Sequence, residues 1–379
     1  MNQARELRIG AHRVWPPVVL APMAGVTNAP FRTMCRRFGG GLLVSEMVMA
    51  LPIAESRSDR TWKLASFAPE ETVRSIQLYG TDPAIMGRAV ARLVDTAHVD
   101  HVDLNFGCPV RKVTRHGGGA AVPARPALLR AIVRAAVRAA DNAGVPVTIK
   151  FRKGVDDGLI TYLDAGRIAE DEGCAAVALH ARTAAQLYSG EADWSAIATL
   201  KSAVSSIPVL GNGDVWEATD ALAMMQATGC DGIVIGRGCL GRPWLFRDLA
   251  AVFAGAATPR PPTLGEVNAM LTEHARLLVD WFGPLIGMRE VRKHTGWYLA
   301  GYTVGHDVRV RLHEVFSLHQ LEAILDGLDP SVTMNPEGMR LHRGPQGGPQ
   351  RVTLPDGWLD DPQSDGAPAR EAELAISGG

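Results

Sequence analysis

Cys108 is the residue whose surroundings point most directly to chemistry. It stands in Asn105-Phe106-Gly107-Cys108-Pro109, after an apolar run and between a glycine and a proline, which predicts a loop. A free thiol has a pKa of about 8.5, so at neutral pH it is mostly protonated and can donate a proton. Asn105 can fix a substrate edge by paired hydrogen bonds. The competing interpretation of Cys108 is a small buried core residue.

Two glycine-rich turns later in the chain have the composition of a phosphate site. Gly211-Asn212-Gly213-Asp214 follows one aliphatic run, and Gly236-Arg237-Gly238 follows the next. Backbone N–H groups in such turns can point at an anion, glycine permits its close approach, and Arg237 adds a charged donor. The alternative is that these glycines serve only tight turns. Two such turns on successive runs favour the phosphate interpretation.

Three more polar residues end aliphatic runs. Lys150 follows Val145-Pro146-Val147-Thr148-Ile149 and can stabilise the negative charge that develops on the N1–O2 edge of a reduced flavin. Gln77 can hydrogen-bond the pyrimidine edge of a flavin, and His180 can donate to its phosphate or ring oxygens. Each residue also has an ordinary structural explanation, such as a strand-end lysine that extends to solvent. Their shared position at the ends of runs carries the argument.

The elements that must position these residues are eight short aliphatic runs, each followed by a helical pattern. Nearly continuous apolar runs are typical of parallel strands buried on both faces. Eight such units predict an α/β fold of the (β/α)8 TIM-barrel type, in which polar residues at the strand ends converge on one face. A doubly wound open sheet is the alternative. The runs are Val18–Met23, Leu42–Met47, Val73–Tyr79, His101–Phe106, Val145–Phe151, Ala175–His180, Ile207–Gly211 and Gly232–Gly236.

The strand pattern stops after Arg242-Pro243-Trp244. Amphipathic periodicity predicts three helices over Leu264–Trp281, Met288–Tyr302 and Val308–Leu325. From Pro336 glycine and proline accumulate and aliphatic periodicity is lost, which indicates disorder. We therefore expect a catalytic barrel over 1–254, a small helical domain over 263–335 and a disordered tail over 336–379.

Composition limits the class of protein. Thirty-nine basic and 40 acidic residues give a net charge of −1, so any nucleic-acid site must be a local patch. The five cysteines include no CxxC pair and no zinc-type spacing, so we expect neither disulfides nor a metal. The N-terminus lacks a signal-like apolar stretch and no run approaches membrane-spanning length. We expect a cytoplasmic monomer with no membrane association.

Taken together, these segments resemble the tRNA-dihydrouridine synthase family, and its bacterial B-type subgroup most closely. The resemblance runs in order from about Leu7 to Leu328 and does not reach the segment after Pro336. The matching pieces are Leu20-Ala21-Pro22-Met23-Ala24-Gly25-Val26-Thr27, Val44-Ser45-Glu46-Met47, Asn105–Pro109 with Lys112-Val113, Gly117-Gly118-Gly119-Ala120-Ala121, His180-Ala181-Arg182-Thr183, Tyr188-Ser189-Gly190-Glu191-Ala192, Gly211–Asp214, Gly236-Arg237 with Gly241–Trp244, and Arg292-Lys293-His294.

The resemblance implies an FMN prosthetic group, NADPH as reductant and tRNA as substrate. It implies that hydride passes from reduced FMN to uracil C6 while Cys108 gives a proton to C5, forming 5,6-dihydrouridine. It also implies FMN contacts from a set of residues at the strand ends. These are Pro22, Met23, Ala24, Gln77, Lys150, Asn212, Gly213, Asp214, Gly236 and Arg237, to which the strand-end argument adds His180.

The helical domain of this family binds tRNA, yet this one is not basic overall. Its positive charges gather around Arg292 and Lys293. With Lys112, Arg182 and their basic neighbours at the barrel mouth, they can form one strip that follows the phosphates. The alternative for each is a solvated surface charge.

Two other functions fit parts of the pattern. An FMN barrel of the dihydroorotate dehydrogenase type, acting on a free pyrimidine, would share the flavin, lysine and phosphate site but has no use for an RNA-binding helical domain. An RNA-binding barrel that has lost catalysis would have no need of Cys108, Asn105 and Lys150. Activity on free uridine would favour the first, and a colourless protein that binds tRNA the second.

Overall fold

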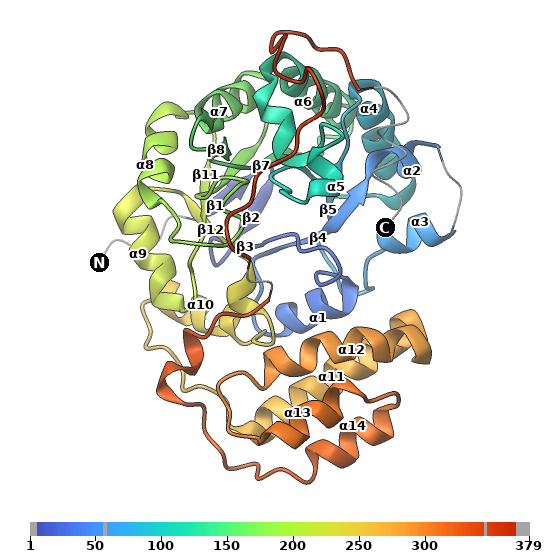
Figure 1. Cartoon of the computed structure of the whole chain (residues 1–379), viewed down its shortest axis with the longest axis vertical. Coiled ribbons are helices and arrows are strands. Elements are labelled where there is room, and N and C mark those ends of the chain that lie inside the picture. The colour runs from blue at the N-terminus through green and yellow to red at the C-terminus, as the bar shows by residue number, and fades with distance from the viewer. Residues whose placement is uncertain (1–5, 56–58, 345–346, 369–379) are drawn as a thin grey trace.

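Eight parallel strands close into a barrel at the centre of the molecule (Figure 1). The computed structural model describes residues 6–55, 59–344 and 347–368. The predicted runs become the barrel strands, and pairing of the last strand with the first excludes an open sheet. The strands are β3 (Val18–Leu20), β4 (Leu42–Met49), β5 (Ser75–Tyr79), β6 (His101–Phe106), β7 (Val147–Arg152), β10 (Ala176–His180), β11 (Val209–Asn212) and β12 (Gly232–Ile235).

Burial on both faces explains why the strands read as continuous apolar runs. In β3, Val18 and Leu20 pack outward against the helices, whereas Val19 packs into the barrel interior. A hairpin of β1 (Leu7–Ile9) and β2 (His12–Val14), which the sequence analysis did not predict, adds its apolar residues to the interior cluster. The barrel is therefore a filled core rather than a pore.

A ring of helices surrounds the barrel. Pro126 begins α6, and Arg130 and Arg134 on its polar face pair with Glu172 at the end of α7. A second unpredicted hairpin, β8 (Gly154–Asp156) with β9 (Leu159–Ile160), follows β7. The helices are α1 (Ala29–Arg37), α2 (Ala50–Glu55), α3 (Asp59–Leu64), α4 (Pro83–Arg92), α5 (Arg111–Thr114), α6 (Pro126–Asp141), α7 (Tyr162–Asp171), α8 (Trp194–Ala203), α9 (Ala218–Thr228) and α10 (Leu245–Phe253).

Four helices follow the barrel, where the sequence predicted three. The expected helix over Val308–Leu325 is two helices, because the Ser317 hydroxyl accepts from the N–H of Gln320 and starts a new one. The four form their own apolar cluster, which Trp244 of the barrel joins. No helix in the described part of the chain is long and apolar enough to cross a membrane. The helices are α11 (Leu264–Phe282), α12 (Pro284–Tyr298), α13 (His306–His313) and α14 (Leu318–Leu325).

The segment after residue 335 corrects another expectation. Predicted as a disordered tail, its described residues run from the helical domain across the barrel to α6 (Figure 1). Arg343 is 1% exposed and donates to the carbonyls of Ala300 and Gly338, and Trp358 is also buried. Lost periodicity excludes regular helix and strand, but an extended chain can still anchor a few large side chains. Residues 369–379 lie outside the described residues.

One ion pair is enclosed completely by the fold. Arg32 of α1 binds the carboxylate of Glu71 through Nε at 2.7 Å and Nη2 at 2.8 Å, and both side chains are buried. Arg32 also donates to the carbonyl of Thr27, so the pair joins α1 to the chain before β5. Loss of one partner would leave an uncompensated buried charge.

Arg32→Met should therefore lower the free energy of unfolding by about 3 to 5 kcal/mol. Arg276→Met is the matched control, because Arg276 pairs with Glu322 at a similar distance on the surface, and it should cost less than about 1 kcal/mol. Urea unfolding followed by circular dichroism measures both. Equal losses would contradict the argument from burial.

Candidate active site

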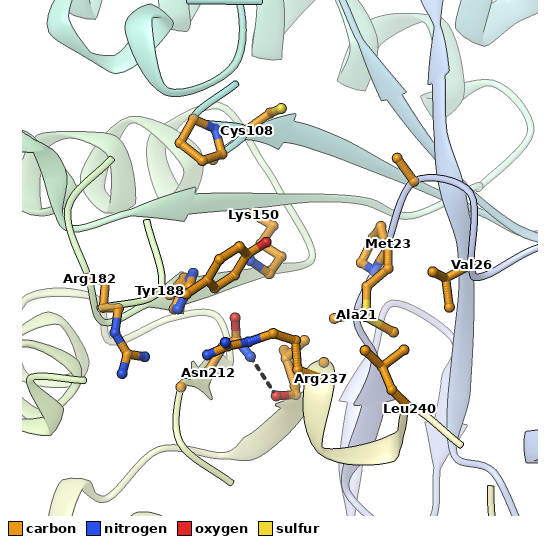
Figure 2. Close-up of a pocket in the computed structure, with 18 of the residues that line it drawn as sticks. Ala21, Met23, Val26, Cys108, Lys150, Arg182, Tyr188, Asn212, Arg237 and Leu240 are labelled. Carbon is orange, nitrogen blue, oxygen red and sulfur yellow. Dashed lines mark hydrogen bonds between the residues drawn. The ribbon is translucent and has the colours of Figure 1, made fainter. Parts of the chain in front are cut away.

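A cavity of about 670 Å³ opens at the carboxyl ends of the barrel strands. Figure 2 shows Cys108 on one side of this cavity and Asn212 and Arg237 on the other, with Lys150 between them in this view. The structure brings fifteen of the seventeen residues proposed from sequence to its lining. They are Pro22, Met23, Ala24, Gln77, Asn105, Cys108, Lys150, His180, Arg182, Asn212, Gly213, Asp214, Gly236, Arg237 and Lys293.

A chain of buried hydrogen bonds leads from the barrel interior to the Cys108 loop. Asp103 accepts from Gln77 Nε2 at 2.6 Å and from the hydroxyl of Thr148 at 2.5 Å. Gln77 Oε1 accepts from Asn105 Nδ2 at 2.8 Å. Asn105 Oδ1 in turn accepts from the backbone N–H groups of Gly107 at 3.0 Å and Cys108 at 2.9 Å. The side-chain amides of Gln77 and Asn105, which we expected to contact ligands, thus also link the barrel interior to the Cys108 loop.

The Cys108 thiol is kept protonated by its surroundings. Its side chain is 9% exposed, and burial raises the pKa of the thiol, although a backbone N–H and the nearby cations Arg152 and Lys150 oppose this shift. Arg152 also donates to the carbonyl of Gly107 at 2.9 Å, which fixes the loop from the side. At neutral pH the group is therefore an acid in a fixed position, not a thiolate.

Lys150 and His180 carry less positive charge than in water. Removal from solvent, reinforced by Arg152, lowers the pKa of Lys150 to about 8, while Asp103 and Cys108 oppose the shift when they are ionised. Burial also lowers the pKa of His180, in the same direction as the cations around it. His180 is therefore neutral at pH 7 and offers one donor and one acceptor, whereas Lys150 remains mostly cationic.

The two glycine-rich turns form a cradle suited to an anion. A Cβ at Gly213, whose φ is +134°, would lie 2.6 Å from Ala192 Cβ, so the close approach requires glycine. Arg182 binds Asp214 at 2.8 Å, yet its buried Nη1 has no hydrogen-bond partner among the residues that the structure describes, and it lies 3.8 Å from that Cβ position. The Arg237 guanidinium lies 4.2 Å from the Tyr188 ring centroid. A phosphate here would supply the partner that Arg182 lacks.

The residues proposed for RNA separate into different environments. Lys293 reaches the cavity from α12 and donates to the carbonyl of Gly25 at 3.2 Å, whereas Arg292 turns away to the carbonyl of Val315 at 2.8 Å. Lys112 lies on α5 and does not line the cavity. Arg182 is 1% exposed, so it cannot join the surface strip expected from sequence. Its guanidinium holds carbonyls of the 189–190 turn instead.

Comparison with known proteins decides the family. The model for dihydrouridine synthases matches residues 19–331. The chain belongs to the dihydrouridine synthase family. It is 53% identical to a probable tRNA-dihydrouridine synthase of Mycobacterium tuberculosis H37Rv, over 98% of this chain and 97% of that protein. It is 41% identical to tRNA-dihydrouridine synthase B of Pseudomonas putida, over 81% of this chain and 89% of that protein.

Membership in this family confirms the resemblance drawn from sequence and makes the protein an oxidoreductase. Among solved structures, histamine dehydrogenase from Rhizobium sp. 4-9 aligns with a TM-score of 0.51 and 14% identity, over 86% of this chain and 63% of that one. This likeness extends to the fold alone. It agrees with the barrel described above.

This dihydrouridine synthase family member also lines its cavity with residues to which the sequence gave another role or none. Arg152, expected among the basic neighbours of Lys112 and Arg182 in the surface strip, is 4% exposed. Arg152 ties the Cys108 loop to the carbonyls of Thr183 and Leu187. Tyr188 and Trp216 flank Arg237. The Tyr188-Ser189-Gly190 segment belongs to a motif already noted in the sequence. Trp216 could have been predicted as a cavity residue from its position two residues after Asp214, the last residue of the first glycine-rich turn.

Asp103 gives the site a measurable pH signature. Burial raises its pKa to about 6, although hydrogen bonds from Thr148 and Gln77 oppose the shift, so the folded state holds the proton more tightly than the unfolded chain. Ionisation therefore destabilises the fold, by an amount that grows between about pH 4 and pH 6 and stays constant above.

Asp103→Asn removes this titration. The free energy of unfolding of the variant minus that of the native protein should increase by about 3 kcal/mol from pH 4 to pH 7. The amide can also shift this difference by a constant amount, which does not affect its change with pH. Urea unfolding of both proteins across this range measures the difference. A difference that does not change with pH would show that Asp103 titrates normally.

Proposed function

We propose that this enzyme reduces the C5–C6 double bond of uridine in tRNA to 5,6-dihydrouridine, with FMN as prosthetic group and NADPH as reductant. The observation that carries the proposal is a buried, protonated thiol facing the same cavity as a phosphate cradle and a cationic lysine. The names of the relatives, which are tRNA-dihydrouridine synthases, support the substrate.

The cavity fits FMN on the structure's own evidence. The unpartnered Arg182 Nη1 beside Gly213, together with Gly236 and Arg237, suits a single phosphate. FMN held here would supply the hydride chemistry for uracil C6, with NADPH as its reductant. Pro22, Met23 and Ala24 line the same cavity from the loop after β3. Lys150 interacts electrostatically with Asp103 and Cys108. As a mostly cationic group in the same cavity, it can stabilise an electron-rich ring edge.

Cys108 is the acid in this proposal. Its Sγ holds the proton that uracil C5 requires, because burial keeps the pKa of the thiol above its ordinary value. Asn105 and Arg152 hold the loop by its backbone, at the Cys108 N–H and the Gly107 carbonyl respectively. The sulfur is therefore placed before substrate arrives, which reduces the entropic cost of the proton transfer.

The helical domain lies where a tRNA must pass. Lys293 and Trp297 of α12 line the cavity together with the barrel loops, so the helical domain borders the space that a base would enter. A uridine can reach the cavity only after it leaves its stack, which requires contacts to the RNA backbone on both sides of the mouth. Lys293 on one side and Lys112, with the exposed Arg111 and Arg115, on the other are suited to phosphates. A free pyrimidine would need none of these.

Cys108→Ala tests the mechanism. The variant should keep FMN and reduce it with NADPH at the native rate, but lose about two to four orders of magnitude in tRNA uridine reduction, since only that half-reaction needs the proton. Stopped-flow flavin absorbance follows both half-reactions. Cys174→Ala, which changes a buried cysteine before β10, is the control and should leave both rates unchanged. Native tRNA turnover by Cys108→Ala would assign the acid elsewhere, and FAD or no flavin in the purified enzyme would reject the cofactor.

Lys293→Glu tests the RNA surface. Affinity for tRNA should fall, and the slope of log K against log salt should shrink by about one, because one phosphate contact and its counterion release are lost. Arg138→Glu is the matched control, because Arg138 is exposed on α6, on the outer surface of the barrel. Fluorescence anisotropy of labelled tRNA at several salt concentrations measures both variants. An unchanged slope for Lys293→Glu would move the contact to the Arg111–Arg115 helix.

A further inference from the structure

The strap, defined as residues 336–344 and 347–368, runs from the helical domain across the barrel to α6 (Figure 1). His342 packs edge-on against Trp216 at 4.9 Å between ring centroids. Further on, the N–H of Gln350 donates to the carbonyl of Ala185 at 2.9 Å, in the loop that carries Tyr188. The strap lies outside the part of the chain that the family model matches. Neither the family fold nor the proposed reaction accounts for it.

Trp358 is the largest anchor of the strap on the barrel. It is 6% exposed, and its Nε1 donates to the carbonyl of Ala121 at 2.9 Å. The Arg125 guanidinium lies 4.7 Å from its ring centroid, and Arg125 also donates to the strap at the carbonyl of Ser364. The indole ring presses so closely on Gly117 that an added Cβ would lie 2.4 Å from its Cη2 atom.

The same glycine-rich turn touches Cys108 on its other side. The N–H of Ala120 donates to the Cys108 carbonyl at 3.0 Å. Gly119 has a φ of +55°, and a Cβ there would lie 2.5 Å from the Cys108 carbonyl oxygen and 3.0 Å from Cys108 Cβ. The turn over 117–121 is thus a single backbone layer between the indole ring and the cysteine.

From this geometry we propose that Trp358 is a positioning residue for Cys108. Asn105 and Arg152 hold the Cys108 loop from within the barrel, and Trp358 closes it from the outside by pressing the 117–121 turn onto the cysteine. The consequence for uridine reduction rests on the proposed function above. The consequence for the position and burial of the thiol does not.

Trp358→Ala should let the turn relax away from Cys108. Water then reaches the thiol, and its pKa, raised by burial, falls toward its ordinary value. A fall of one unit gives about tenfold more thiolate at a fixed pH below the pKa. We therefore expect iodoacetamide to alkylate Cys108 of the holoenzyme about tenfold faster, with the pH profile of the rate displaced to lower pH. All five cysteines are buried, so peptide mass spectrometry is used to assign the label to Cys108 or to one of the other four.

The kinetic readout separates positioning from general damage. Reduction of the flavin by NADPH should remain native, whereas single-turnover oxidation by tRNA should slow by about tenfold to a hundredfold, the typical effect of a misplaced reacting group. Trp358→Phe keeps a flat apolar ring at this position. It should restore most of the native alkylation rate and most of the native rate of oxidation by tRNA. If Trp358→Ala does not fold, Trp358→Leu carries the same measurements.

Leu359→Ala is the matched control, because Leu359 neighbours Trp358 in the strap and is 45% exposed. It should leave alkylation and both half-reactions unchanged. Native alkylation rate and pH profile in the Trp358 variants, even with a lower melting temperature, would overturn the proposal and leave Trp358 a structural anchor only. Native uridine reduction by Cys108→Ala would instead contradict the proposed function, and the alkylation result would still decide the role of Trp358.

Discussion

The site depends on one buried carboxylate. Asp103 has no cation in hydrogen-bonding contact, and it accepts from Thr148 and Gln77 inside the barrel. That orientation leaves the Gln77 oxygen for Asn105, and Asn105 in turn presents its own oxygen to the two N–H groups of the Cys108 loop. Because an amide can be satisfied in only one orientation here, the position of Cys108 is set from the barrel core outward. A break at any link would leave buried polar groups without partners.

Buried cations also help to position the loops around the cavity, in addition to the chain of hydrogen bonds that starts at Asp103. Arg152 and Arg182 both donate to backbone carbonyls, Arg152 to the Cys108 and Tyr188 loops and Arg182 to the turn over 189–190, and Arg182 also pairs with Asp214. Desolvation lowers the pKa of Arg152 to about 10, so it is still charged at neutral pH. The cavity wall therefore carries positive charge that loop carbonyls solvate only in part. An anionic ligand completes that solvation, which is the electrostatic reason the cavity suits a phosphate and an electron-rich ring.

The sequence predicted the barrel because burial on both faces leaves an unmistakable apolar run, and it predicted most of the cavity because barrel strand ends must converge. It could not predict which partner each amide takes, since Gln77 and Asn105 fit a ligand and a neighbouring side chain equally well. It did not predict the burial of Arg182, because an arginine after a strand can face solvent or the protein. The sequence did not predict that the strap is ordered, because a single buried tryptophan among glycines and prolines, Trp358, produces no periodic apolar pattern.

Helix α12 shows why the helical domain and the barrel act as one unit. Within a single turn it directs Lys293 and Trp297 to the cavity and His294 into the interface with the barrel, where the imidazole lies 5.9 Å from the Phe31 ring. Burial lowers the pKa of His294, so the ring is neutral and packs as an aromatic group. Because Trp244 of the barrel also joins the apolar cluster of the helical domain, loss of these helices would expose apolar core residues. The helix to which we assign RNA contacts is thus oriented by the barrel core beneath it.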